Sequence, residues 1–238
     1  EAAVALGELK RAQHHLKPIT QSRLETSEPN YRLGRIYLTM GQNDKALAAF
    51  RRACDINPDD GRYLASTAKA LLVIGALEDA ASMAQRALSS DPDNIDILKT
   101  VGTVLVNTGR LTKGLDALEH VLKSNLSDAS TQIAIAQDLI LEAEKHHQYH
   151  KSVADQGHTS RRDVLIDESI RRAADLHGDP DEIQEWRGRA MVLAGEAKTA
   201  IPLLEPLVHK RPNPGLRCTL ATAYCIAGDF KRAKQEVE

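Results

Sequence analysis

The sequence predicts an all-α solenoid, in which antiparallel helix pairs stack on one another without a single central core. Two observations predict it. Glycines recur at intervals of 34 residues, at Gly7, Gly41, Gly75 and Gly109. Other small residues keep the same interval, namely Gly34, Ala68, Gly102 and Ala136, and also Ala12, Ala46, Ala80 and Gly114. A period of roughly 20–50 residues is typical of helix–turn–helix arrays, whose units fold by stacking on their neighbours.

Residues 27–60 indicate how one unit forms. Apolar and small residues recur with helical spacing on both sides of Gly41. Gly41 is expected to end the first helix, because glycine readily adopts positive φ. Asn43 or Asp44 is expected to cap the second helix, and Pro58 to end it, since proline cannot donate the next helical hydrogen bond. Neither helix has enough apolar surface to fold alone, so adjacent units must stack.

These residues resemble the tetratricopeptide repeat (TPR) family. Its pattern has small residues at the eighth and twentieth positions, a large apolar residue at the twenty-fourth and proline at the thirty-second. The residues of the 27–60 unit that match this pattern are Gly34, Ala46, Phe50, Ala53 and Pro58. The resemblance implies a right-handed superhelix of about six to seven units.

The resemblance covers nearly the whole chain. It makes residues 1–143 a regular array, with a partial unit at 1–26, full units at 27–60, 61–94 and 95–128, and the first helix of a fourth unit at 129–143. A polar, His-rich insertion at 144–163 expands the inter-helix turn of that fourth unit. Residues 164–238 hold its second helix, a unit at 181–213 and a truncated unit at 214–238. Pro202 and Pro206 predict that the helix containing them is bent or begins late.

Composition narrows the setting. A net charge of −2 gives no reason to expect nucleic acid as a partner. No apolar run is long enough for a transmembrane helix, so we expect no direct membrane insertion. The three cysteines favour reduced thiols and a cytoplasmic location. The chain begins without methionine and inside a repeat, which suggests a piece of a longer protein. A signal sequence in that parent would make the location periplasmic.

The resemblance also predicts a ligand site, because the first helix of each TPR unit lines a concave groove. The groove residues it assigns here are Tyr31, Arg35, Leu38, Arg62, Lys69, Leu72, Lys99, Thr103, Asn107, Ile133 and Gln137. Four of these are cations, at 35, 62, 69 and 99, and such a basic stripe suits an extended segment with carboxylates. The alternative is that they are ordinary solvated charges, each worth little.

Other candidate chemistry is sparse. His146 and His150 are spaced to put two imidazoles on one helix face, but no cysteine is near, and a solvated loop without metal is the preferred interpretation. Trp186 could anchor a ligand, although packing against the preceding unit is preferred. No nucleophile elbow, phosphate-binding glycine loop or paired-cysteine motif occurs. We therefore expect no catalytic residues, no cofactor and no enzymatic activity in this chain.

The sequence thus predicts a non-catalytic protein–protein interaction scaffold that binds a protein or peptide segment in the concave groove. Two alternatives stay open. The chain could be the TPR region of a larger enzyme, for example a glycosyltransferase, that presents substrate to it. It could also be a component of bacterial envelope assembly, polysaccharide export or secretion. The end repeats expose uncapped apolar faces, which predicts self-association as a further property.

Overall fold

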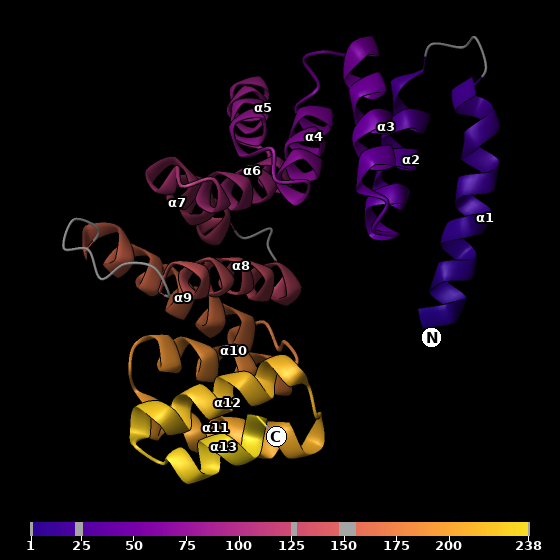
Figure 1. Ribbon diagram of the computed structural model, residues 1–238. Coiled ribbons are helices and arrows are strands. Elements are labelled where there is room, and N and C mark those ends of the chain that lie inside the picture. The colour runs from indigo at the N-terminus through magenta and orange to yellow at the C-terminus, as the bar shows by residue number, and fades with distance from the viewer. Residues whose placement is uncertain (1, 22–25, 125–127, 148–155, 238) are drawn as a thin grey trace. The chain divides into compact units, whose positions relative to one another are not determined.

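The computed structural model describes residues 2–21, 26–124, 128–147 and 156–237, with side chains over 7–20, 26–124, 128–144 and 161–237. Over these ranges the chain is all-α, with thirteen helices and no strand (Figure 1). None of these helices is both long enough and apolar enough to cross a membrane. The prediction of an all-α array of helix pairs is confirmed.

The chain divides into two compact units, Glu1–Val121 and Leu122–Glu238. The division falls inside the 1–143 stretch that the sequence predicts as one regular array. The helices of the first unit are α1 (Ala2–Gln21), α2 (Ser27–Thr39), α3 (Asn43–Ile56), α4 (Gly61–Val73), α5 (Leu77–Ser90), α6 (Ile95–Asn107) and α7 (Leu111–Lys123), the last of which reaches the boundary. Those of the second are α8 (Ala129–His147), α9 (Gln156–Asp175), α10 (Pro180–Leu193), α11 (Ala197–Lys210), α12 (Pro214–Ala227) and α13 (Phe230–Val237).

The turns within helix pairs use glycine in the left-handed conformation. The five such glycines are Gly41, Gly75, Gly109, Gly195 and Gly228, with φ between 69° and 84°. At the first of them, the Gly41 N–H donates to the Leu38 carbonyl and the Gln42 N–H to the Tyr37 carbonyl. These bonds satisfy carbonyl groups that the end of α2 would otherwise leave unpaired. The predicted role of Gly41 is confirmed.

Helix caps differ from the sequence prediction. Neither Asn43 nor Asp44 caps α3, because the three-residue turn already places Asn43 inside the helix. Side-chain caps are found instead on other helices, where a residue accepts a hydrogen bond from a backbone N–H two or three positions later. These caps are Asp60 on α4, Asn94 on α6, Asp128 on α8, Asp179 on α10, Asn213 on α12 and Asp229 on α13.

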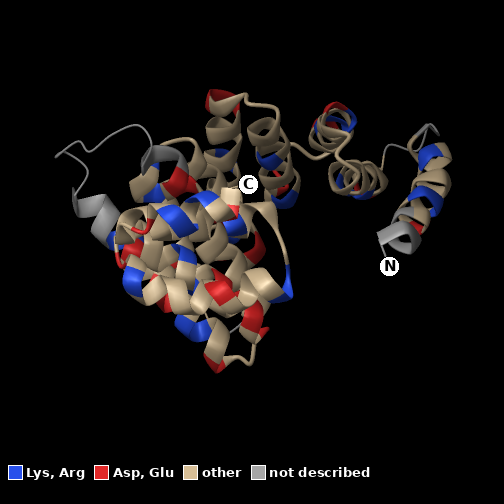
Figure 2. Ribbon diagram, turned by 60° about the horizontal axis from the view of Figure 1, so that its bottom comes forward, with Lys and Arg blue, Asp and Glu red and all other residues tan. Residues whose placement is uncertain are grey.

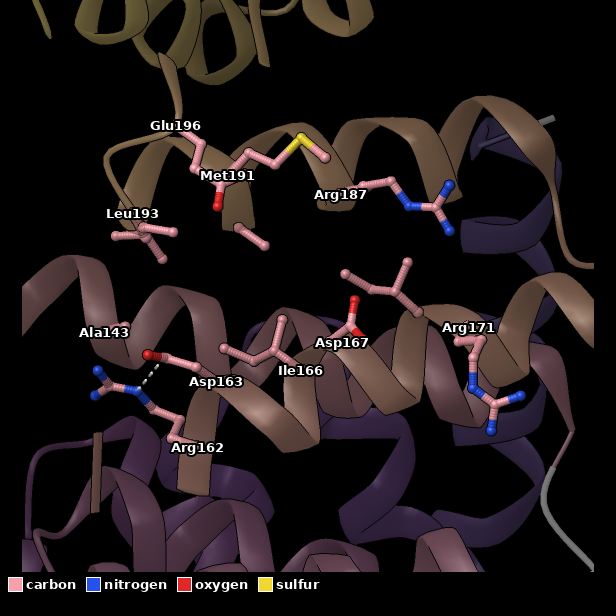
Figure 3. Close-up of a pocket in the computed structure, with 13 residues that line it drawn as sticks. Ala143, Arg162, Asp163, Ile166, Asp167, Arg171, Arg187, Met191, Leu193 and Glu196 are labelled. Atoms are coloured by element: carbon pink, nitrogen blue, oxygen red, sulfur yellow. Dashed lines mark ion pairs between the residues drawn. The ribbon is translucent and has the colours of Figure 1, made fainter. Parts of the chain in front are cut away.

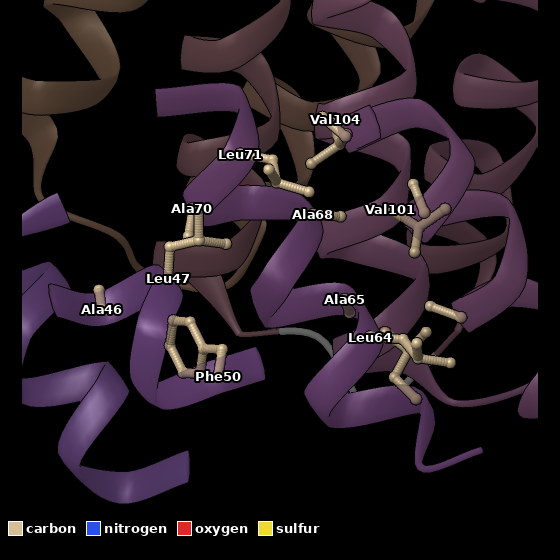
Figure 4. Close-up of a cluster of buried hydrophobic side chains, with 14 of the residues drawn as sticks. Ala46, Leu47, Phe50, Leu64, Ala65, Ala68, Ala70, Leu71, Val101 and Val104 are labelled. Atoms are coloured by element: carbon tan, nitrogen blue, oxygen red, sulfur yellow. The ribbon is translucent and has the colours of Figure 1, made fainter. Parts of the chain in front are cut away.

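A hydrophobic cluster runs from α2 to α6 in the first unit (Figure 4). Phe50 of α3 is fully buried, and its ring packs against the backbone of Gly34 in α2. Ala68 of α4 and Ala80 of α5 are likewise fully buried. Small residues at these positions allow two helix axes to approach closely, so each pair buries apolar surface that neither helix could bury alone.

The predicted 144–163 insertion is helical wherever the structure describes it. Helix α8 continues through residue 147 and α9 begins at 156, whereas residues 148–155 lie outside the described part. Residues of high helix propensity, such as Glu144, prolong a helix past the end of its apolar pattern. The loss of apolar periodicity in the sequence therefore does not mark the end of helix α8.

Helix α11 is continuous from Ala197, although it contains Pro202 and Pro206. Of the two predicted outcomes, a late start is therefore wrong, and a bend stays a prediction. Both proline side chains are exposed, so their rings do not disturb the packing of the helix. The Gln184 side chain of α10 donates a 2.8 Å hydrogen bond to the Leu203 carbonyl beside Pro202, which ties the two helices together at this point.

Candidate functional site

The predicted groove residues of the first unit lie on α2, α4 and α6, and α4 contacts both of the other helices. We call this surface the first-helix face; its predicted residues are Tyr31, Arg35, Leu38, Arg62, Lys69, Leu72, Lys99, Thr103 and Asn107. Arg35, Arg62 and Lys69 are exposed, and the other six are half-buried. All nine therefore present some surface to solvent, as a binding face requires.

Tyr31 is the aromatic centre of this face. Its ring centroid lies 5.0 Å from that of Tyr63 and 6.0 Å from that of Phe50. The guanidinium carbons of Arg35 and Arg62 each lie 5.8 Å from the Tyr31 centroid. Cation–π contact at this distance holds both guanidinium groups beside the ring. The face thus combines a fixed aromatic surface with positive charge.

The charge of Arg62 is matched within the fold. Its guanidinium pairs with Asp60 at 2.8 Å and lies 3.8 Å from Glu28. Burial opposes ionisation of Asp60, but hydrogen bonds from the Arg62 side chain and backbone lower the pKa of its carboxyl overall. The hydrogen bond from Arg32 is the main reason why the pKa of Glu28 is lowered. Arg62 is therefore less available to a ligand than its exposure suggests.

Arg35 and Lys69 differ from Arg62, because neither forms an ion pair within the described part of the chain. They occupy equivalent positions in two successive first helices, 34 residues apart. Both side chains are exposed. Within the described residues, the basic stripe of four predicted from the sequence thus reduces to two cations of unmatched charge, Arg35 and Lys69, with Lys99 half-buried farther along.

The other predicted groove residues belong to the second unit. Gln137 of α8 is half-buried, but Ile133 and Ile140 are buried in the core. Ile133 thus contributes to the core of this structure, and its place in the groove stays a prediction. An aliphatic side chain at such a position satisfies a groove pattern and a core pattern equally well, and only the packing distinguishes them.

The candidate metal ligands are not placed by the structure. The backbone of His146 is in the last turn of α8, but its side chain and the whole of His150 lie outside the described part. Among the side chains that the structure describes, no group of three or more His, Cys, Asp or Glu is arranged to hold a metal ion.

Trp186 belongs to the packing of the second unit. Its side chain is buried on α10, which contacts both α8 and α9. The Arg189 guanidinium lies 4.6 Å from the indole centroid and pairs with Glu185 at 3.2 Å and Glu144 at 3.8 Å. Burial raises the pKa of Glu144, and Arg189 partly opposes the shift. This cluster fixes α10 against the end of α8.

One feature of the second unit escaped the sequence analysis: a cavity of about 580 Å³ between α9 and α10 (Figure 3). Apolar side chains such as Ile166 and Met191 line it, with charged residues such as Asp167 and Arg187 beside them. Its signal in the sequence is weak. It consists of an arginine at 187, directly before Gly188, where other first helices carry Leu, Thr, Val or Ile.

The helix pairs, their left-handed glycine turns and their small-residue contacts define an α-solenoid of repeated units. The Tetratricopeptide repeat family model matches residues 1–60 and 31–95. No curated protein matches the chain. The tetratricopeptide repeat pattern is thus matched over residues 1–95, and the described helix pairs beyond them share its left-handed glycine turns and small-residue contacts.

Solved structures share this fold. A tetratricopeptide repeat protein from Parabacteroides merdae superposes with a TM-score of 0.68 at 16% identity, over 98% of this chain and 86% of that one. The type IV pilus biogenesis factor PilW superposes with a TM-score of 0.67 at 15% identity, over 88% of this chain and 90% of PilW. PilF of Pseudomonas aeruginosa superposes with a TM-score of 0.59 at 16% identity, over 88% of each chain. At these identities the likeness is one of fold.

Proposed function

We propose that this chain is a protein-interaction scaffold, and that its first-helix face binds an extended partner segment carrying carboxylates. The observation that carries the proposal is the pair Arg35 and Lys69, two exposed cations at equivalent positions of neighbouring first helices, without ion pairs in the described chain. Exposed charges that form no ion pair within their own chain are available to a ligand of opposite charge, and they accelerate its encounter with the protein.

Apolar contacts accompany the two cations. Leu38 and Leu72 are also one repeat apart, and both are half-buried on the same helices as Arg35 and Lys69. The Tyr31 ring adds aromatic surface beside Arg35. A segment in which acidic and aliphatic residues alternate could therefore place its carboxylates toward the cations and its aliphatic side chains toward the leucines and the tyrosine.

This function requires no reaction, and we assign none to the chain. Cys54, Cys218 and Cys225 are free thiols, which suits a reducing, cytoplasmic setting.

The test uses a fluorescein-labelled peptide in which glutamates alternate with leucines, and a second peptide with glutamine in place of glutamate. Fluorescence anisotropy should show tighter binding of the glutamate peptide. The double variant Arg35→Glu/Lys69→Glu should weaken that binding by about tenfold, because each exposed charge pair is worth up to about 1 kcal/mol. Circular dichroism should show unchanged helix content.

The matched control is Arg51→Glu/Arg52→Glu, which makes the same change of net charge on exposed residues of α3. It should leave the affinity unchanged. Equal weakening by both double variants would mean that net charge alone attracts the peptide, and equal affinity for the two peptides would remove the case for carboxylate recognition.

A further inference from the structure

The cavity between α9 and α10 arises because this helix interface lacks side chains that close the equivalent interfaces. The residue directly before the small residue of each first helix is buried at Leu33, Thr67, Val101, Ile135 and Leu220. In α10 this position is Arg187, whose side chain is exposed. Four residues later, Met191 is half-buried, whereas the equivalent residues Tyr37, Leu71, Leu105, Leu139 and Tyr224 are buried.

The opposite wall belongs to α9, whose lining residues are the buried Ile166 and Ile170 and the charged Arg162, Asp163, Asp167 and Arg171. Ile166 and Ile170 lie one helical turn apart and line the cavity opposite Ala190 and Met191 of α10. The cavity volume, about 580 Å³, falls in the range of sites that bind ligands. Apolar side chains from outside the described chain would therefore fill this cavity and complete the interface between α9 and α10.

The charges at the two ends of the cavity differ in sign. Figure 3 shows Asp163 and Glu196 toward one end and Arg187 toward the other. At the first end Arg162 also lines the cavity, but it pairs with the buried Glu142 at 3.0 Å and with Asp163 at 3.7 Å, so acidic charge remains in excess. Toward the other end Arg171 pairs with Glu168 and Asp175, so Arg187, which forms no ion pair with a described residue, supplies the positive charge there. Asp167 lines the cavity between the two ends (Figure 3). An occupant therefore meets an acidic end and a basic end.

We propose that this cavity is a second docking site, which binds an amphipathic helix of a protein partner with aliphatic side chains between α9 and α10. The site is separate from the first-helix face. From Asp163 to Arg171 the wall extends about two helical turns, which suits a short helix laid in a groove. The partner helix carries Lys or Arg near its N-terminus, where it faces Asp163 and Glu196 of this chain. Near its C-terminus it carries a carboxylate, which faces Arg187. The positive end of its dipole then also faces the acidic end.

Two labelled peptides of identical composition test the proposal on the full chain. Each is an amphipathic helix with leucines along one face; the first has lysine near its N-terminus and glutamate near its C-terminus, and the second has these charges exchanged. The first should bind about fivefold more tightly in fluorescence anisotropy, because charge complementarity fixes orientation. Its addition should shift the backbone amide NMR signals of Ile166 and Met191.

Two variants localise the binding. Ala194→Phe, at an exposed position that lines the cavity, should weaken the first peptide about tenfold by filling the groove, whereas Ala48→Phe on an exposed site of α3 should not. Arg187→Glu changes only an exposed rim residue and should reduce the preference between the peptides. Absence of saturable binding, equal binding of both peptides, or insensitivity to Ala194→Phe in a folded variant would overturn the proposal. The Arg35→Glu/Lys69→Glu variant should bind normally here, which separates this site from the first-helix face.

Discussion

Gly34 and Phe50 lie so close that a Cβ atom at residue 34 would be 2.5 Å from Cε1 of the phenylalanine ring. Such a contact is shorter than packed carbon atoms tolerate. Two further pairs repeat the relationship: Gly102 with Leu118 at 2.7 Å, and Gly188 with Leu204 at 2.5 Å. The small residue that recurs through the sequence is therefore the point where the second helix of a pair meets the backbone of the first.

Gly34→Ala should destabilise the protein by about 1–3 kcal/mol, because the added methyl group overpacks a fully buried ring. Without such a contact, replacing a glycine in a helix interior by alanine stabilises the protein. Gly7→Ala in α1 provides the control, since no described atom lies within 4 Å of the position that its Cβ would take; it should be neutral or stabilising. Urea unfolding followed by circular dichroism measures both. Phe50→Leu added to Gly34→Ala should recover part of the loss, and simple additivity of the two changes would argue against the contact.

His177 adopts the same left-handed conformation as the turn glycines, with φ of 59°, between α9 and α10. Gly75 has φ of 83° in the turn within the α4–α5 pair. Since a side chain costs about 1–2 kcal/mol in this conformation, Gly75→Ala should lose about that much. His177→Gly should gain about 0.5 kcal/mol, because the unfolded chain becomes more flexible and offsets part of the relief. Thermal melting compares the two, and a lower Tm for His177→Gly would mean that the imidazole contributes a stabilising contact.

Glu142 and Arg162 form an ion pair whose side chains are only 3% and 12% exposed. Glu142→Ala should destabilise the protein by about 3 kcal/mol or more, because it leaves the arginine with little water and no main partner. Asp175→Ala, which breaks the exposed pair of Asp175 with Arg171, should cost about 0.5 kcal/mol or less.

The double variant Glu142→Leu/Arg162→Met should restore most of the stability that Glu142→Ala loses, since apolar residues of similar size often replace a buried pair without cost. Chemical unfolding measures all three variants. Equal effects of Glu142→Ala and Asp175→Ala would show that burial of the pair does not matter.

Tyr224 connects stability to alkaline pH. Burial, and then the hydrogen bond from its hydroxyl group to Glu205, raise the pKa of Tyr224 to about 12. Because the folded pKa lies above the unfolded value of about 10, the stabilisation is complete below pH 10 and is lost as pH rises toward 12. The urea midpoint of the wild-type chain should therefore fall over this window. It should fall less steeply in Tyr224→Phe, and an identical slope in the two proteins would contradict the assignment.

Features that depend on one residue and its neighbours could be predicted from the sequence. The left-handed turn at Gly41 is one, since positive φ is a property of that residue. The close pairing of Gly34 with Phe50 is another, because a fixed repeat period converts sequence spacing into contact. Residues 144–147 are helical against expectation, because helix propensity can prolong a helix after its apolar periodicity has ended.

The properties of the candidate sites depend on residues that are far apart in the sequence, so they could not be predicted from it. Arg62 and Lys69 are both cations in the sequence. Of these two, only Arg62 pairs with carboxylates of the fold, namely Asp60 and Glu28. Ile133 matched the groove pattern but is buried. The cavity beside Met191 requires that α9 and α10 both leave the same volume unfilled, which no single helical pattern reveals.

By itself, the sequence determined the repeat pattern, the helix pairs and the positions of their tight turns, since these follow from local conformation repeated at a constant interval. The tertiary structure decided which described cations remain unmatched on the first-helix face, namely Arg35 and Lys69, and where an interface is left open, between α9 and α10. The physical reason is that charge neutralisation and cavity volume are sums over side chains brought together from separate helices. Such sums have a value only after the helices have packed.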